Sequence, residues 1–292
     1  MERLVGYLLV ALSGLSFGAM AVLARFAYAA GADPYTTLAL RFGIAALAML
    51  AWVAARRVRL PRGRVLAGLL AAGAFGLGGV SLTFFLALTM AGAGLVSLLH
   101  FLYPALVALV GAVFYRERPG KVRLAALGLA LAGTALTVGD PGEATGLGIF
   151  LAVLSAVIFA AYFHAANRLT VQAGSVAATT VTLTGAGVAF AALAALRGPS
   201  LPHGALGWWS VVGLALVSTA LAYGTLLAGM RRIGPTPAAM LSTLEPVVTV
   251  LLAAAFLGET LGVLPLFGGA LIVGAALLLA SEDRWKPRGP QA

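Results

Sequence analysis

The 292 residues of this chain are 61% hydrophobic and only 10% charged, and their mean hydropathy is +1.03. A soluble domain carries about 25% charged residues, so this composition excludes a water-soluble fold and predicts an integral membrane protein. The net charge of +10 comes from basic residues in a few short segments, which argues against a nucleic-acid partner, and there is no cysteine for disulfides or thiolate chemistry.

Ten apolar segments follow one another along the chain, each long enough for a membrane helix of about 20 residues. The predicted spans are Leu4–Ala29, Pro34–Ala55, Val65–Leu88, Ala93–Tyr115, Pro119–Val138, Thr145–Leu169, Ser175–Leu196, Leu206–Met230, Pro235–Leu257 and Val263–Ala280. No segment alternates apolar and polar residues as a barrel strand would. We therefore expect an all-α polytopic membrane protein with ten transmembrane helices.

Basic residues divide unequally between the two faces that these spans define. One face carries 16 lysines and arginines, the other carries Arg197 alone, and Arg25 and Arg41 lie within predicted spans. Such an excess marks the cytoplasmic loops of membrane proteins. We predict a bacterial inner (cytoplasmic) membrane protein with both termini in the cytoplasm.

The second half of the chain repeats the first half at an offset of 142 residues. The best stretch pairs residues 103–120 with residues 245–262, where 6 of 18 positions are identical. Pro104 falls on Pro246 in this alignment. Chance matches are common between apolar sequences, but shared prolines and glutamates are poor candidates for chance.

Each copy holds five predicted spans, and an odd number places the second copy in the membrane upside down. We therefore predict two inverted five-helix repeats, residues 1–142 and 143–292. Inverted repeats with a substrate site near the midplane are typical of transporters. A duplication that only enlarges a scaffold remains the alternative.

Glu245 is the one carboxylate near the middle of a predicted span, where an ionisable group is costly and needs a partner. The repeat offset pairs Glu245 with Tyr103 and Ser242 with His100, just before the duplicated prolines. Because proline interrupts helical hydrogen bonding, both copies should expose polar groups at one depth. Glu245 is expected to act either as counter-ion for a substrate ammonium or as carrier of a coupling proton.

Aromatic residues follow the same symmetry. Phe17 corresponds to Phe159, Met20 to Tyr162, and Ser81 to Tyr223. Aromatic side chains at helical spacing often only pack, but their polar neighbours on both copies favour a cavity wall. The predicted substrate-binding residues are Glu245, His100, Tyr103, Ser242, Tyr223, Phe17, Phe159 and Tyr162. Three histidines and nine carboxylates show no metal-ligand spacing, so we expect no metal and no cofactor.

Two further motifs have simpler explanations. Glu117 and Glu259 each precede a predicted helix and are expected to cap its N-terminus. Residues 14–18 match the G-x-S-x-G nucleophile elbow, but that elbow needs a strand-to-helix turn and here lies in a predicted membrane helix. An intramembrane serine hydrolase, with His100 or His164 as base, is the remote alternative, and we expect no enzyme.

The segment TLEPVVTVLLAAAFLGETL (243–261) resembles the EamA-type signature of the drug/metabolite transporter superfamily, and FFLALTMAGAG (84–94) resembles its third-to-fourth helix junction. The resemblance covers both repeats, although Tyr103 replaces the glutamate in the first. It implies a ten-helix inner-membrane carrier of small metabolites, often an exporter, and the chain also resembles amino-acid exporters of the YddG type.

We therefore predict an exporter of small metabolites such as amino acids, including aromatic ones, that works by alternating access. Its partners would be a small-molecule substrate, the lipid bilayer and, if Glu245 titrates, a coupling proton. A nucleotide-sugar or phosphate-ester exchanger is the alternative. Such an exchanger would need cationic residues in its cavity to bind phosphate, and only Arg25 and Arg41 lie within predicted spans.

Overall fold

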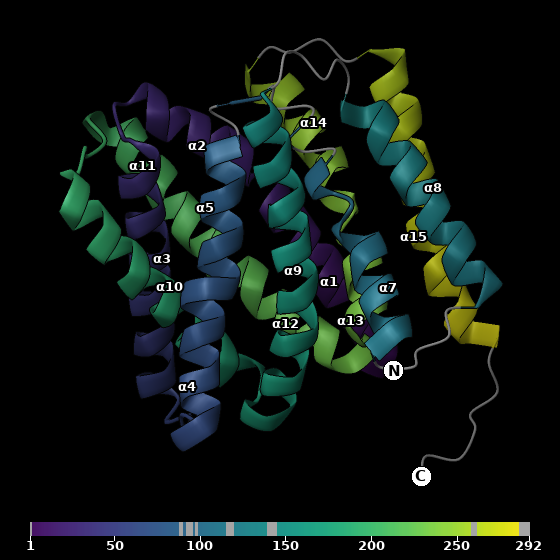
Figure 1. Cartoon of the computed structure of the whole chain (residues 1–292), viewed down its shortest axis with the longest axis horizontal. Coiled ribbons are helices and arrows are strands. Elements are labelled where there is room, and N and C mark those ends of the chain that lie inside the picture. Colours follow the sequence, from purple (N-terminus) through teal and green to yellow (C-terminus); the bar gives the residue numbers. More distant parts are fainter. Residues whose placement is uncertain are drawn as a thin grey trace.

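The computed structural model describes residues 2–87, 90–91, 96, 99–114, 120–138, 145–257 and 262–285, which fold almost entirely into helices (Figure 1). The helices of the first half are α1 (Glu2–Gly18), α2 (Met20–Ala29), α3 (Pro34–Ala55), α4 (Gly63–Ala71), η1 (Ala72–Leu77), α5 (Gly78–Ala87), α7 (Tyr103–Phe114) and α8 (Lys121–Val138). The helices of the second half are α9 (Gly146–Ala173), α10 (Ser175–Arg197), α11 (Gly204–Ala215), η2 (Leu216–Leu221), α12 (Ala222–Ile233), α13 (Pro235–Leu241), α14 (Leu244–Leu257) and α15 (Val263–Trp285). The segments η1 and η2 are π-helices, whose backbone hydrogen bonds span five residues instead of four.

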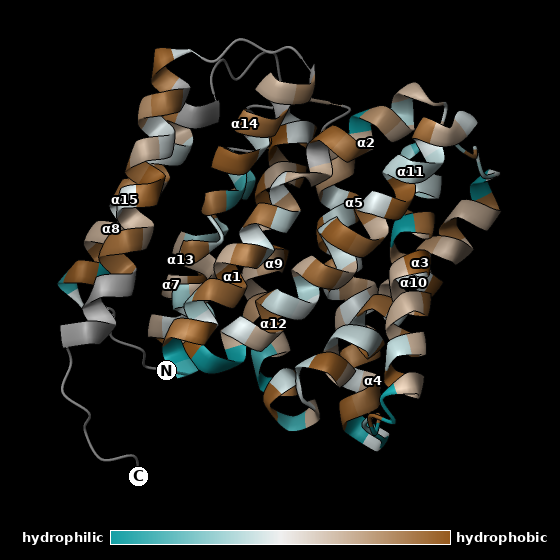
Figure 2. Cartoon of the chain, turned by 180° about the vertical axis from the view of Figure 1, so that it is seen from behind, coloured by the Kyte–Doolittle hydropathy of each residue, from teal (hydrophilic) through white to brown (hydrophobic). Residues whose placement is uncertain are grey.

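Seven helical stretches are long and apolar enough to cross a membrane, with 22 to 30 residues each. They are Glu2–Ala29, Pro34–Ala55, Gly63–Ala87, Gly146–Ala173, Ser175–Arg197, Gly204–Ile233 and Pro235–Phe256. Figure 2 shows hydrophobic residues along the helices and hydrophilic residues mainly near their ends, as a bilayer requires. The prediction of an all-α membrane protein is therefore confirmed.

The structure supports fewer spans than the ten predicted. The helix α7 and the apolar stretch Leu266–Leu279 of α15 are shorter than the seven, and α8 is not among them. Part of the predicted span Ala93–Tyr115 lies outside the described residues, as do Glu117 and Glu259. The count of ten spans and the capping role of these glutamates remain predictions.

The helices recur at the offset of 142 residues found in the sequence. α8 begins at Lys121 and α15 at Val263, and α3 and α10 are paired in the same way. The members of each pair pack together, and the two pairs lie at opposite edges of the molecule (Figure 1). Between these edges α1 packs on α12 and α14, while its counterpart α9 packs on α5 and α7. The centre of the molecule is therefore built from both repeats.

Two features of the helices differ from the sequence-based prediction. The first predicted span is interrupted at Ala19, between α1 and α2. The third and eighth spans contain the π-helices η1 and η2, which lie at nearly equivalent positions of the two repeats. Neither π-helix contains a proline, so the local sequence gives no signal for it.

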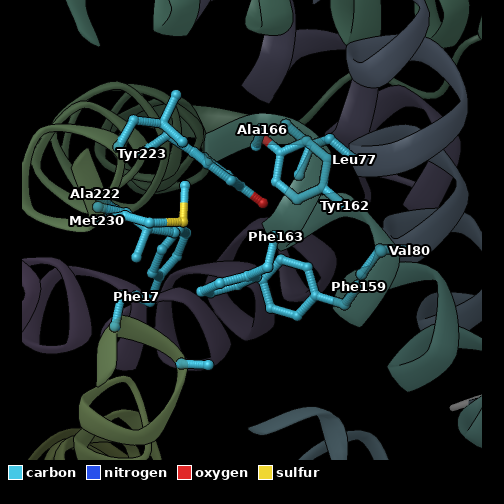
Figure 3. Packing of buried hydrophobic residues seen from close by; sticks show 14 of the residues in the cluster. Phe17, Leu77, Val80, Phe159, Tyr162, Phe163, Ala166, Ala222, Tyr223 and Met230 are labelled. Carbon is cyan, nitrogen blue, oxygen red and sulfur yellow. The ribbon is translucent and has the colours of Figure 1, made fainter. Parts of the chain in front are cut away.

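Aromatic side chains pack at the centre. Figure 3 shows Phe17 and Tyr223 facing Phe159 and Phe163 between α1, α12 and α9. The rings of Phe17 and Tyr223 meet edge to face with centroids 4.9 Å apart, and those of Phe159 and Phe163 do the same at 4.9 Å. Edge-to-face pairs add about 0.5–1.5 kcal/mol to the stabilisation from burial, so these contacts stabilise the positions of the four rings.

Candidate functional site

Two helix breaks lie near each other, because α13 packs on α7. In the second repeat α13 ends at Leu241, α14 begins at Leu244, and Pro246 lies in the first turn of α14. In the first repeat a turn precedes α7, and Pro104 lies in its first turn. Proline is tolerated there because an N–H in the first turn has no helical partner. The duplicated prolines thus account for a break in each repeat.

A cavity of about 60 Å³ lies beside these breaks. Side chains of both repeats form its wall: Phe17, Met20, Arg41, Ser81, Phe84, Phe85, His100, Tyr103, Phe159, Tyr223, Leu226, Ser242 and Glu245. A water molecule needs about 15 Å³ by this measure, so the cavity has room for about four. An amino-acid-sized molecule would have to displace some of the wall.

The structure brings seven of the eight predicted site residues to this cavity, and Tyr162 is the exception. Tyr162 lies behind Phe159, with the two rings stacked at a centroid distance of 6.1 Å. Its buried hydroxyl has no hydrogen-bond partner in the structure. Since position 162 is three residues past Phe159, it lies about 4.5 Å further along α9, past the cavity wall.

Glu245 and its neighbours form the polar part of the wall. Glu245 lies in the first turn of α14, where the positive end of the helix dipole favours a carboxylate. Its N–H donates to the Ser242 carbonyl over 3.0 Å, across the helix break. Ser242, beside the break before α14, and Tyr103, beside the break before α7, line the same cavity.

His100 is held in one orientation by a short hydrogen-bonded chain. Its Nδ1 lies 2.9 Å from the Ser155 hydroxyl oxygen, and that hydroxyl donates to the Ala152 carbonyl over 2.7 Å. Because the hydroxyl has only one hydrogen, Nδ1 must be the donor, which assigns the neutral imidazole's lone pair to Nε2. The ring stacks on Phe159, with centroids 5.5 Å apart. The cavity therefore borders an imidazole whose free nitrogen accepts hydrogen bonds.

Arg41 is the main residue that sequence reasoning left out of the site. Only 3% of its surface is exposed, and its guanidinium lies 4.9 Å over the Phe42 ring. Its Nε donates to Thr219 Oγ1 over 2.6 Å and its Nη2 to the Ser218 carbonyl over 3.4 Å. The sequence did contain a signal for Arg41, because a cation inside an apolar span is more often a functional residue than a packing residue. Phe84 and Phe85 were also left out, and no polar pattern distinguishes them in the sequence.

The possible nucleophile elbow has no strand-to-helix turn. Gly14 and Gly18 lie within the continuous helix α1, and Ser16 Oγ donates to the Leu12 carbonyl over 2.8 Å. Of the two candidate bases, His100 bonds Ser155, and His164 Nε2 lies 2.9 Å from the Val107 carbonyl. This geometry does not support the hydrolase alternative.

A multi-pass helical protein with a partly polar cavity between two related halves has the architecture of a membrane transporter. The family model of the EamA-like transporter family matches residues 4–139 and 146–281, and the chain belongs to this family. It is therefore a membrane transporter, a class that points away from enzymatic activity.

Individual relatives extend over most of the chain. The threonine/homoserine exporter RhtA of Escherichia coli K12 is 30% identical over 292 residues, which cover 96% of this chain and 93% of RhtA. YicL, an uncharacterized inner membrane transporter of Salmonella typhimurium, is 29% identical over 214 residues, covering 72% of this chain and 71% of YicL. A solved crystal structure at 25% identity shares the fold, with a TM-score of 0.80 over 96% of this chain and 97% of that chain.

Proposed function

We propose that this transporter exports amino acids across the bacterial inner membrane through the central cavity. Ten spans would form two inverted repeats, residues 1–142 and 143–292, with both termini in the cytoplasm. The repeats would rock about the cavity and open it to each side in turn, as in other inverted-repeat carriers. The aromatic part of the wall would take the amino-acid side chain.

The observation that carries this proposal is the position of Glu245. It is the one carboxylate among the described side chains that line the cavity. A carboxylate in apolar surroundings is a natural partner for an ammonium group, because the pair neutralises two charges that are each costly to bury. The similarity to a threonine/homoserine exporter supports the same substrate class.

A phosphate-ester or nucleotide-sugar exchanger fits the site less well. Phosphate groups carry up to two negative charges and are bound by clusters of cations. Arg41 is the one cation among the described lining side chains, and Glu245 would repel a phosphate. The second role open to Glu245, that of carrying a coupling proton, is compatible with amino-acid export.

Counterflow in proteoliposomes tests the proposal. Vesicles preloaded with an unlabelled amino acid should accumulate the same labelled amino acid from outside if the protein exchanges it. The panel should contain threonine, homoserine, phenylalanine and tyrosine, with a hexose phosphate and a nucleotide sugar as negative controls. We expect accumulation of at least one amino acid and of neither phosphate compound. Exchange of the phosphate compounds alone would overturn the proposal.

A further inference from the structure

Arg41 is held at the cavity by the π-helix η2. Thr219 Oγ1 donates its own hydrogen to the Leu214 carbonyl over 2.7 Å and so presents a lone pair to the Arg41 Nε. Ser218, whose carbonyl accepts from Arg41, donates its hydroxyl to the Ser16 carbonyl of α1 over 2.8 Å. Both hydrogen bonds of the guanidinium go to η2, and these η2 residues are in turn bonded to α11 and α1, which is the preorganisation expected of a binding group.

The two repeats differ at this point, although their helices correspond. At the offset of 142 residues, Arg41 corresponds to Leu183 and Thr219 corresponds to Leu77. Both leucines are fully buried with 0% exposure. The corresponding helices therefore pack closely with two leucines at the positions that Arg41 and Thr219 occupy in the other copy. Packing alone does not explain why one copy carries a guanidinium and its hydroxyl partner.

Arg41 lines the cavity and retains hydrogen-bonding capacity. A guanidinium has five N–H donors, and the π-helix takes two of them. Neither Thr219 Oγ1 nor the Ser218 carbonyl neutralises its charge. Glu245 is the one carboxylate among the described side chains that line the same cavity. The wall therefore presents a guanidinium held by two hydrogen bonds and a carboxyl group to whatever enters.

We propose that Arg41 binds the α-carboxylate of the substrate while Glu245 binds its ammonium, so that the cavity selects zwitterions. This inference rests on the proposed function, in which amino acids are the cargo. A guanidinium binds a carboxylate through two parallel hydrogen bonds, and in a dry site it discriminates strongly against ligands that lack the group. Each missing group would leave one buried charge of the wall without its partner.

Competition by substrate analogues measures this selection. The best amino acid from counterflow is compared with its decarboxylated amine and with its deaminated carboxylic acid, as inhibitors of its own uptake. We expect the wild-type protein to prefer the amino acid over both analogues by at least about tenfold. Arg41→Gln should abolish the preference over the amine, and Glu245→Gln should abolish the preference over the acid. Arg62→Gln, at an exposed loop arginine, is the matched control and should keep both preferences.

Arg41→Lys and Thr219→Val keep the inference testable if Arg41→Gln does not fold. Lysine keeps the charge but loses the two parallel donors, and Thr219→Val removes the acceptor of the Arg41 Nε. Either variant should lower the preference for the amino acid over the amine. A folded Arg41 variant with the wild-type preference would overturn the inference and leave amino-acid export intact. Failure of every amino acid in counterflow would instead overturn the proposed function itself.

Discussion

Glu245 lies on the cavity wall in the first turn of α14, and Glu245→Gln removes its charge while keeping its shape. We expect the apparent affinity for an amino acid to fall at least about tenfold, equivalent to about 1.4 kcal/mol, because the ammonium loses its counter-ion. Counterflow over a range of substrate concentrations measures the change. If Glu245 also carries a coupling proton, the pH dependence of uptake should become flat.

The matched control is Glu2→Gln, which removes an exposed carboxylate at the start of α1. It should leave affinity and pH dependence unchanged. A folded Glu245→Gln protein with wild-type affinity, rate and pH dependence would show that Glu245 is structural. The substrate site would then have to be sought elsewhere on the wall.

Asp33 lies outside the membrane spans and joins two loops of different repeats. Its carboxylate caps α3 by accepting from the Tyr35 and Thr36 N–H groups over 2.8 and 3.1 Å, and it also accepts from the Ser200 N–H over 3.0 Å. Burial raises the pKa of Asp33, but its hydrogen bonds outweigh burial and hold the pKa below the ordinary value. The ionised form is therefore favoured in the folded protein.

This lowered pKa predicts the direction of an acid effect. The stabilisation from Asp33 should be complete above the unfolded-state pKa of about 3.9 and should disappear as the pH falls through the lower folded-state value. Thermal unfolding in detergent between about pH 6 and pH 3 measures it. Asp33→Asn keeps the cap and should lose less stability on acidification than the wild type. An equal loss in both proteins would contradict this assignment.

At the scale of elements, α10 packs so closely on α4 that their backbones touch. A Cβ added to Gly185 would lie 2.3 Å from the Leu70 carbonyl oxygen, so Gly185→Ala must push the helices apart. We expect a loss of about 1–3 kcal/mol in stability, seen as a lower unfolding temperature. Gly224→Ala is the matched control, because a Cβ there meets nothing within 4 Å. Equal effects of the two substitutions would show that this contact does not limit stability.

The long helices and the breaks at the duplicated prolines were predictable, and the interruption at Ala19 and the π-helices were not. Hydrophobic runs mark each long helix, and Pro104 and Pro246 mark the breaks, because proline acts through its own backbone. The segments η1 and η2 depend instead on tertiary contacts, such as those of Thr219 with Arg41, which no local pattern encodes.

The same distinction applies to the candidate site. The repeat offset selected Glu245 and His100, since their polar character and symmetry are both visible in sequence. Arg41 was left out because its direction depends on how η2 and α3 pack, and Tyr162 was included because helical spacing does not show how far the cavity extends along α9.

Across the whole molecule, alternating access depends on a centre that both repeats share. α1 and α9 each pack on helices of the other repeat, and the breaks before α7 and α14 border one cavity. A motion of one repeat against the other would therefore change this cavity directly. Alternating access requires that water and substrate reach it.

Thiol accessibility at Ser242 tests whether water and substrate reach the central cavity, and the chain has no native cysteine that would react as well. Ser242→Cys places one thiol on the wall, and Thr243→Cys places one beside it at a buried position outside the described lining. In proteoliposomes, a small water-soluble thiol reagent should modify Cys at 242 much faster than at 243, and the transported amino acid should slow that reaction at least about tenfold. Absence of modification at 242, or modification that no transported substrate slows, would contradict a central substrate cavity.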